Sequence, residues 1–144
     1  MEEPRVTLSP DGRSAAYYDN LGGNVDIYLA SLSGGRPRRL THDRGWDTGP
    51  AWSPDGGKIA FVRRPSDEAV DTTIYVMSRN GSRQRRMAAL GAYSPVWSPD
   101  GHKIAFLRGK QLFVINSDGT NERALPGSAT RLAWSPDSRQ NGHR

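Results

Sequence analysis

The chain has 144 residues with a mean hydropathy of −0.72, and 35% of its side chains are hydrophobic. This composition is typical of one globular domain; it excludes wholesale disorder and, with no long apolar run, a membrane-spanning helix. The absence of cysteine excludes disulfides, zinc–thiolate sites and cysteine nucleophiles. The net charge is +5, and because the basic residues are spread along the chain we expect no nucleic-acid partner and no membrane insertion.

A repeated turn motif divides the chain. Ser-Pro-Asp-Gly begins at Ser9, Ser53 and Ser98, and a degenerate fourth copy begins at Ser135, with Ser138 in place of the glycine. Proline fixes the backbone at the second position of a type I turn, and glycine tolerates the exit. The residues that precede the four copies, in chain order, are Leu8, Trp52, Trp97 and Trp134.

The same series of short segments follows each of the first three copies. In the second unit these are residues 58–62, 73–77 and 85–87, which are rich in β-branched and aromatic residues and are separated by turn residues such as Asn80-Gly81. Such segments read as strands, so each unit predicts a four-stranded antiparallel meander of about 40 residues. The sequence predicts an all-β fold with units at about 5–41, 49–90 and 94–126, the start of a fourth at 129–137 and a polar tail at 138–144.

The second unit carries a family resemblance most clearly. Its Trp-Ser-Pro-Asp-Gly, Lys-Ile-Ala-Phe, Ile-Tyr-Val-Met and Arg-Arg-Met segments resemble the WD40-like Pro-Asp repeat of TolB-type β-propellers, and the likeness extends over residues 4–139. Related blades occur in the N-terminal propellers of prolyl-oligopeptidase-like serine peptidases. The resemblance implies a partial β-propeller of bacterial origin, and TolB-type proteins are periplasmic and bind envelope proteins. A propeller hosts many activities, so the fold alone does not fix the function.

We assign the repeated residues to structure rather than to chemistry. A tryptophan that recurs at one blade position is expected to pack between blades, and an Asp in a Pro-Asp-Gly turn is expected to bond local backbone amides. Basic residues in the outermost strands are expected to protect the sheet edges from aggregation. These basic residues are Arg38, Arg39, Arg85, Arg86 and Arg123.

Irregular loops on one face are the expected place for recognition. In an up-and-down meander this face carries the loops between second and third strands and the links between blades, at residues 20–24, 42–48, 65–72 and 91–94. Aromatic and arginine residues beside acidic ones resemble a protein-binding hot spot. The candidate partner-binding residues are Arg44, Trp46, Asp47, Asp67, Glu68, Asp71 and Tyr93.

No motif for catalysis is apparent in the sequence. It has no Gly-x-Ser-x-Gly nucleophile elbow, no glycine-rich phosphate loop and no His-Glu-x-x-His. We therefore predict a protein-interaction scaffold with no catalytic, cofactor-binding or metal-binding residues and no cofactor. The alternative is part of the substrate-gating propeller of a prolyl-oligopeptidase-like peptidase, and a weaker one is a propeller that binds a small ligand or a sugar.

Three blades do not close a ring, since single-chain propellers usually have four to eight. The two open blade faces are expected to expose interface residues such as Tyr17, Tyr28, Phe106 and Phe113. Either copies of the chain assemble through these faces, or the chain is a fragment of a larger propeller. The degenerate fourth motif favours the fragment. Met1 as the natural start predicts a cytoplasmic protein, whereas a fragment of a TolB-like protein would be periplasmic or extracellular.

Overall fold

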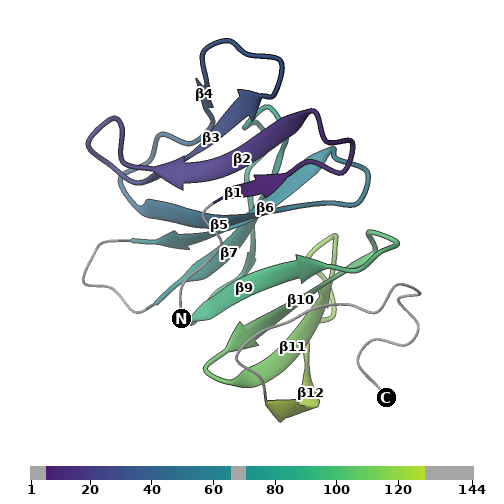
Figure 1. Ribbon diagram of the computed structural model, residues 1–144. Coiled ribbons are helices and arrows are strands. Elements are labelled where there is room, and N and C mark those ends of the chain that lie inside the picture. The colour runs from purple at the N-terminus through teal and green to yellow at the C-terminus, as the bar shows by residue number, and fades with distance from the viewer. Residues whose placement is uncertain (1–5, 66–70, 129–144) are drawn as a thin grey trace.

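The computed structural model describes residues 6–65 and 71–128, and all regular elements in these ranges are β-strands, as predicted. They form three four-stranded antiparallel sheets, each in chain order (Figure 1). The first sheet contains β1 (Val6–Leu8), β2 (Ser14–Asp19), β3 (Asp26–Ser31) and β4 (Arg38–Arg39). The second contains β5 (Trp46–Trp52), β6 (Lys58–Arg64), β7 (Thr73–Ser78) and β8 (Arg85–Ala88), and the third contains β9 (Ala92–Trp97), β10 (Lys103–Arg108), β11 (Gln111–Asn116) and β12 (Arg123–Ser128).

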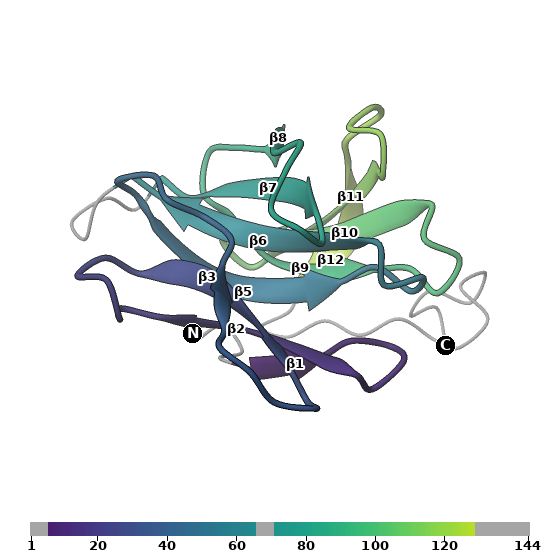
Figure 2. The ribbon, with the colours of Figure 1, turned by 90° about the horizontal axis from the view of Figure 1, so that it is seen from above.

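The three sheets are the blades of a partial propeller, and they follow one another face to face, with the second blade between the other two (Figures 1 and 2). The innermost strands begin earlier than the sequence suggested. The second blade starts at Trp46 rather than at residue 49, and the third starts at Ala92 rather than at residue 94. The predicted strand at 129–137 and the tail at 138–144 lie outside the described residues. No helix in the described ranges is long and apolar enough to cross a membrane.

The Ser-Pro-Asp-Gly turns are held by their own aspartates, as predicted. In the second blade, the Ser53 hydroxyl donates to Oδ1 of Asp55 at 2.7 Å, and the amide of Gly57 donates to the same oxygen at 2.9 Å. The bond from the Gly57 amide and the bond from Ser53 lower the pKa of Asp55. Gly56 takes a φ of +74°, which favours glycine at the turn exit. The aspartates that accept the same two bonds in the first and third blades are Asp11 and Asp100.

The repeated tryptophans join neighbouring blades. The indole Nε1 of Trp52 donates to the carbonyl of Thr7 in the first blade at 3.1 Å, and that of Trp97 donates to the carbonyl of Ala51 in the second blade at 3.0 Å. Both tryptophan side chains are buried. Each tryptophan thus combines a hydrogen bond across the junction with a large buried apolar area.

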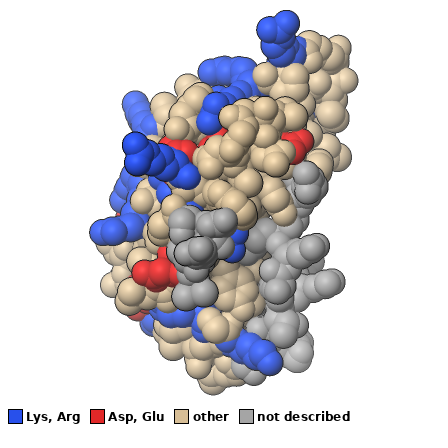
Figure 3. Space-filling model, turned by 90° about the vertical axis from the view of Figure 1, so that its left-hand side faces the viewer, with Lys and Arg blue, Asp and Glu red and all other residues tan. Residues whose placement is uncertain are grey.

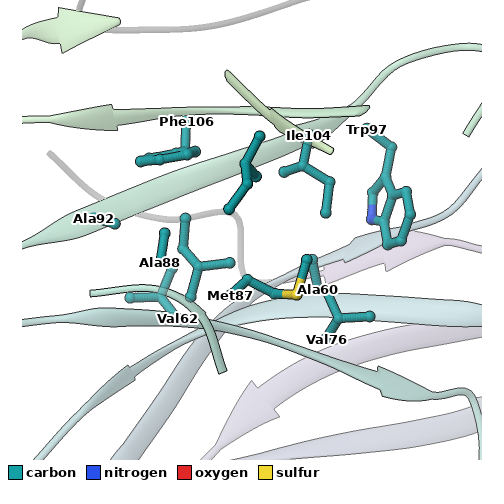
Figure 4. Close-up of a cluster of buried hydrophobic side chains, with 11 residues drawn as sticks. Ala60, Val62, Val76, Met87, Ala88, Ala92, Trp97, Ile104 and Phe106 are labelled. Atoms are coloured by element: carbon teal, nitrogen blue, oxygen red, sulfur yellow. The ribbon is translucent and has the colours of Figure 1, made fainter. Parts of the chain in front are cut away.

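Apolar side chains fill both junctions. Between the first and second blades the buried cluster is Ala16, Ile27, Leu40, Trp52, Ile59, Phe61 and Met77. Between the second and third blades, Figure 4 shows β-strand side chains from both sheets meeting in one layer, among them Val62, Met87, Trp97, Ile104 and Phe106.

The prediction that Phe106 and Phe113 lie on an open blade face is wrong. Phe106 is fully buried between the second and third blades, and Phe113 packs against that cluster. Tyr28 was also expected on an open face, but it is buried. The large apolar side chains that are exposed on the first blade are Val6 and Leu8 of its innermost strand and Leu21 and Leu32 of its loops.

Candidate functional site at the junction of the first two blades

The loops between second and third strands meet the links between blades at one end of the molecule, as the meander predicted. The amide of Asp47 donates to the carbonyl of Val25 at 2.9 Å, and the amide of Gly91 donates to the carbonyl of Thr72 at 3.0 Å. We call this end the link face and define it by residues 20–25, 40–46, 71–72 and 89–92. Each link is therefore tied to the preceding blade before its chain enters the next one.

The link at residues 42–46 is fixed by polar contacts on both sides. The Asn24 side-chain amide donates to the carbonyls of Asp43 and Gly45, both at 2.8 Å. The Gly45 amide donates to Oδ2 of Asp43 at 3.0 Å. A Cβ atom at Gly45 would lie 2.8 Å from the carbonyl oxygen of Arg64, so this position has room only for glycine. The link is a shaped loop rather than a loose connection.

Trp46 and Arg44 are displayed by this fixed link. Trp46 is half-buried, and the guanidinium of Arg64 lies 4.6 Å from its ring centroid, within the range of a cation–π contact. Arg44 is exposed. Trp46 is the first residue of β5 and pairs with Arg64 of β6, so the sheet itself orients its ring.

The other predicted partner-binding residues lie in different surroundings. Asp47 is fully buried and pairs with Arg63, so its expected place on an exposed surface is wrong. Tyr93 belongs to the second junction, where its hydroxyl donates to the carbonyl of Gly109. Asp71 is exposed. Asp67 and Glu68 lie outside the described residues.

Asp47 is part of a buried charge network. Arg63 binds both of its oxygens, with Nε at 2.8 Å from Oδ1 and Nη2 at 3.2 Å from Oδ2. The fully buried Asp26 accepts from Nη2 of Arg39 at 2.7 Å and from the hydroxyl of Thr41 at 3.1 Å. Arg39 was expected to be an edge charge, yet it reaches inward from the outermost strand to neutralise this carboxylate.

Asp43 completes a cluster of three carboxylates with Asp26 and Asp47. One oxygen from each lies within 4.8 Å of the others. Hard cations bind carboxylates in such groups, but Arg39 and Arg63 already bind these, so we assign no metal to the cluster. Burial raises the pKa of Asp47 to about 7; the hydrogen bond from Arg63 acts to lower it, and the neighbouring Asp43 carboxyl acts to raise it.

Sequence reasoning missed Arg63, Asp26 and Arg39 as members of this site. The strand register contains the signal that could have found the network. Asp47 stands opposite Arg63 in the second blade, and the residue opposite the corresponding Arg108 in the third blade is Ala92. A charged residue at a position that is apolar in the next repeat indicates an ion pair or hydrogen bond rather than apolar packing at that position.

Basic side chains are numerous outside this junction. On the face shown in Figure 3, Lys and Arg side chains lie at separate points along the molecule, with other residues between them. Those in or next to the outermost strands are largely exposed, and they include Arg36, Arg38, Arg83, Arg85, Arg86 and Arg123.

Comparison with known proteins agrees with this architecture. A Tol-Pal system protein TolB of Francisella tularensis subsp. mediasiatica is 32% identical over 81 residues, which are 55% of this chain and 18% of that protein. A TolB-type structure from Agrobacterium tumefaciens superposes with a TM-score of 0.77 at 27% identity, covering 96% of this chain and 57% of that one. A prolyl endopeptidase structure superposes with a TM-score of 0.64 at 17% identity, covering 88% of this chain and 22% of that one, which shows a shared fold alone.

The chain therefore spans only part of the length of these relatives. The family model described as the TolB beta propeller domain matches residues 4–140. That match covers nearly all of the sequence, including the three blades described above. The chain belongs to the TolB β-propeller family.

Proposed function

We propose that the chain is a non-catalytic scaffold that binds a protein partner through its link face, with Trp46 as the central contact. The observation that carries this proposal is the fixed display of Trp46: Asn24 and Gly45 hold its link, and Arg64 lies against its ring. Tryptophan and arginine are the side chains most enriched in binding hot spots. A pre-ordered loop also loses less conformational entropy when a partner binds.

The chemistry of the surrounding surface supports a protein rather than a substrate. The exposed Arg44 lies two residues before Trp46 in the chain, and the guanidinium of Arg64 lies against the ring, so an acidic or carbonyl-rich segment beside an apolar side chain would fit this surface. The relative from Francisella tularensis is named for the Tol-Pal system. The partner that we propose is therefore an envelope protein of that system.

Binding of a Pal protein tests the proposal directly. Titration calorimetry with Trp46→Ala should show an affinity about 30-fold weaker than that of the unsubstituted chain, the effect expected of a hot-spot residue worth about 2 kcal/mol. Leu32→Ala is the matched control, because Leu32 is also exposed but lies among the turns at the opposite end. Absence of binding, or equal weakening by both substitutions, would contradict the proposal.

The peptidase alternative has no observation of its own in its favour. Its support is a shared fold with a prolyl endopeptidase at 17% identity. The coding sequence downstream of Arg144 separates the two proposals. A nucleophile elbow in an α/β-hydrolase pattern would identify a gating propeller, whereas further blades would agree with a scaffold.

A further inference from the structure

The charges at the first junction do not balance when all its acids are ionised. Three carboxylates meet two guanidinium groups, and arginine stays protonated at every physiological pH. Arg39 pairs with Asp26, and Arg63 pairs with both Asp47 and Asp43, so the cluster carries one negative charge in excess. An uncompensated charge in a largely buried cluster is costly, and a bound proton is the simplest way to remove it.

Asp43 has an oxygen suited to such a proton. Its Oδ2 accepts from the Gly45 amide at 3.0 Å. Its Oδ1 is buried and lies 2.9 Å from Nη2 of Arg63, but it accepts no aligned hydrogen bond from the residues that the structure describes. A proton held between Asp43 and Asp47 would supply the missing bond and leave the five-group cluster neutral.

We propose that Asp43 and Asp47 share one proton, and that its loss loosens the link at residues 42–46 from the first two blades. The proposal goes beyond the scaffold function and does not depend on it, because it concerns only groups within the chain. The pair would titrate as a unit, so the proton belongs to both residues. Asp43 is the member that would move, since its side chain is 32% exposed whereas that of Asp47 is fully buried.

The groups that face the pair come from every neighbouring element. Arg63 faces Asp47 from β6, and Tyr75 of β7 lies beneath that guanidinium with its ring centroid 4.3 Å away. Asp26 faces the pair from β3, and it is held by Arg39 of β4 and by Thr41. Both oxygens of Asp26 accept a hydrogen bond, whereas Oδ1 of Asp43 accepts none from the described residues, so we assign the proton to the pair formed by Asp43 and Asp47.

The raised pKa of Asp47 fixes the sign of the effect on stability. The folded protein binds this proton more tightly than the unfolded chain, whose carboxyl has the ordinary value of 3.8. The free energy of unfolding should therefore fall as the pH rises from about 4 to about 7 and level off above that range. The aspartates with lowered pKa, among them Asp11 and Asp55, lose their contribution only as the pH falls toward or below 3.8, so they do not produce a decline between pH 5 and 8. Histidine side chains change charge in this range, so a variant of the pair is needed to assign the decline.

Carboxyl ¹³C NMR of the full chain tests the proposal without a substitution. Between pH 4 and 9 the signals of Asp43 and Asp47 should change together with one midpoint near neutrality. The Gly45 amide, which donates to Asp43, should lose protection from hydrogen exchange over the same step. If both carboxyl groups are fully ionised from pH 5 upward, or if the Gly45 amide does not respond, the proposal is wrong.

Asp47→Asn provides the second test, because it keeps the side-chain shape and removes the titrating group. The decline in the free energy of unfolding between pH 5 and 8 should disappear in this variant. Asp55→Asn is the control: it alters a turn aspartate of the same blade and should keep the decline. An unchanged decline in Asp47→Asn would overturn the proposal.

Discussion

The first and second blade junctions share one backbone register but differ in their chemistry. In the first, Asp47 stands opposite Arg63, and three carboxylates and two guanidinium groups are enclosed. In the second, Ala92 stands opposite Arg108, and the enclosed layer is apolar. The repeat therefore fixes where the strands lie, while the acidic residues Asp26, Asp43 and Asp47 make the first junction charged.

The arginine itself is common to both junctions, and only its partners change. Arg63 lies 4.3 Å from the ring of Tyr75, and Arg108 lies 4.5 Å from that of Phe113. Arg63 then binds buried carboxylates, whereas Arg108 binds the carbonyls of Ala89 and Leu90 and the more exposed Glu122. The stacked arginine is a constant part of these two blades, and the acid it meets is specific to the first junction.

Removal of the indole from the apolar junction should have the largest effect on stability. Trp97→Ala deletes a buried ring and its bond to Ala51, so it should reduce the free energy of unfolding by about 3–5 kcal/mol in urea denaturation. Trp46→Ala is the matched control, because that ring is only partly buried and its removal should cost less. Equal losses in the two variants would mean that the junction is not the source of stability.

Removal of the guanidinium from the charged junction should come next. Arg63→Met keeps much of the stem but leaves Asp47 without its partner, and breaking such a buried pair should cost about 3 kcal/mol at pH 8. The loss should shrink at pH 5, because Asp47 can then take up a proton. Urea denaturation at the two pH values measures both effects; a loss that does not depend on pH would argue against a buried charge as its cause.

The corresponding change in the second junction should be the smallest. Arg108→Met removes bonds to two backbone carbonyls and a pair with the partly exposed Glu122, so we expect a loss of about 1 kcal/mol with little dependence on pH. The same denaturation series gives the comparison. A loss as large as that of Arg63→Met would remove the distinction between the two junctions.

The repeated features of the fold were predictable because identical residues recur. Ser53, Asp55 and Trp52 have counterparts in another blade, and each serves the same turn or junction there. Periodic sequence signals of this kind report local geometry that every blade must satisfy.

The charge network was not predictable in the same way, because its members are far apart in the chain and its acidic residues do not repeat. The sequence predicts a second blade that starts at residue 49, which leaves Asp47 in the irregular link at 42–48. In the structure β5 continues through Gly49 and Pro50 with a register shift between Thr48 and Ala51, which accommodates the proline. The strand therefore starts early enough to carry Asp47 into the interior.

The hydrogen bonds that the tryptophan indoles donate across the two junctions run in the same direction along the chain. Each junction described here is closed by a tryptophan of the later blade, which donates backward to a carbonyl of the earlier one. The first blade has Leu8 at that position and therefore offers no indole to any blade that packs against its exposed face. In a ring built from such blades, the seam in front of Leu8 would lack one hydrogen bond that the two junctions described here possess, so a single residue would specify where the ring opens first.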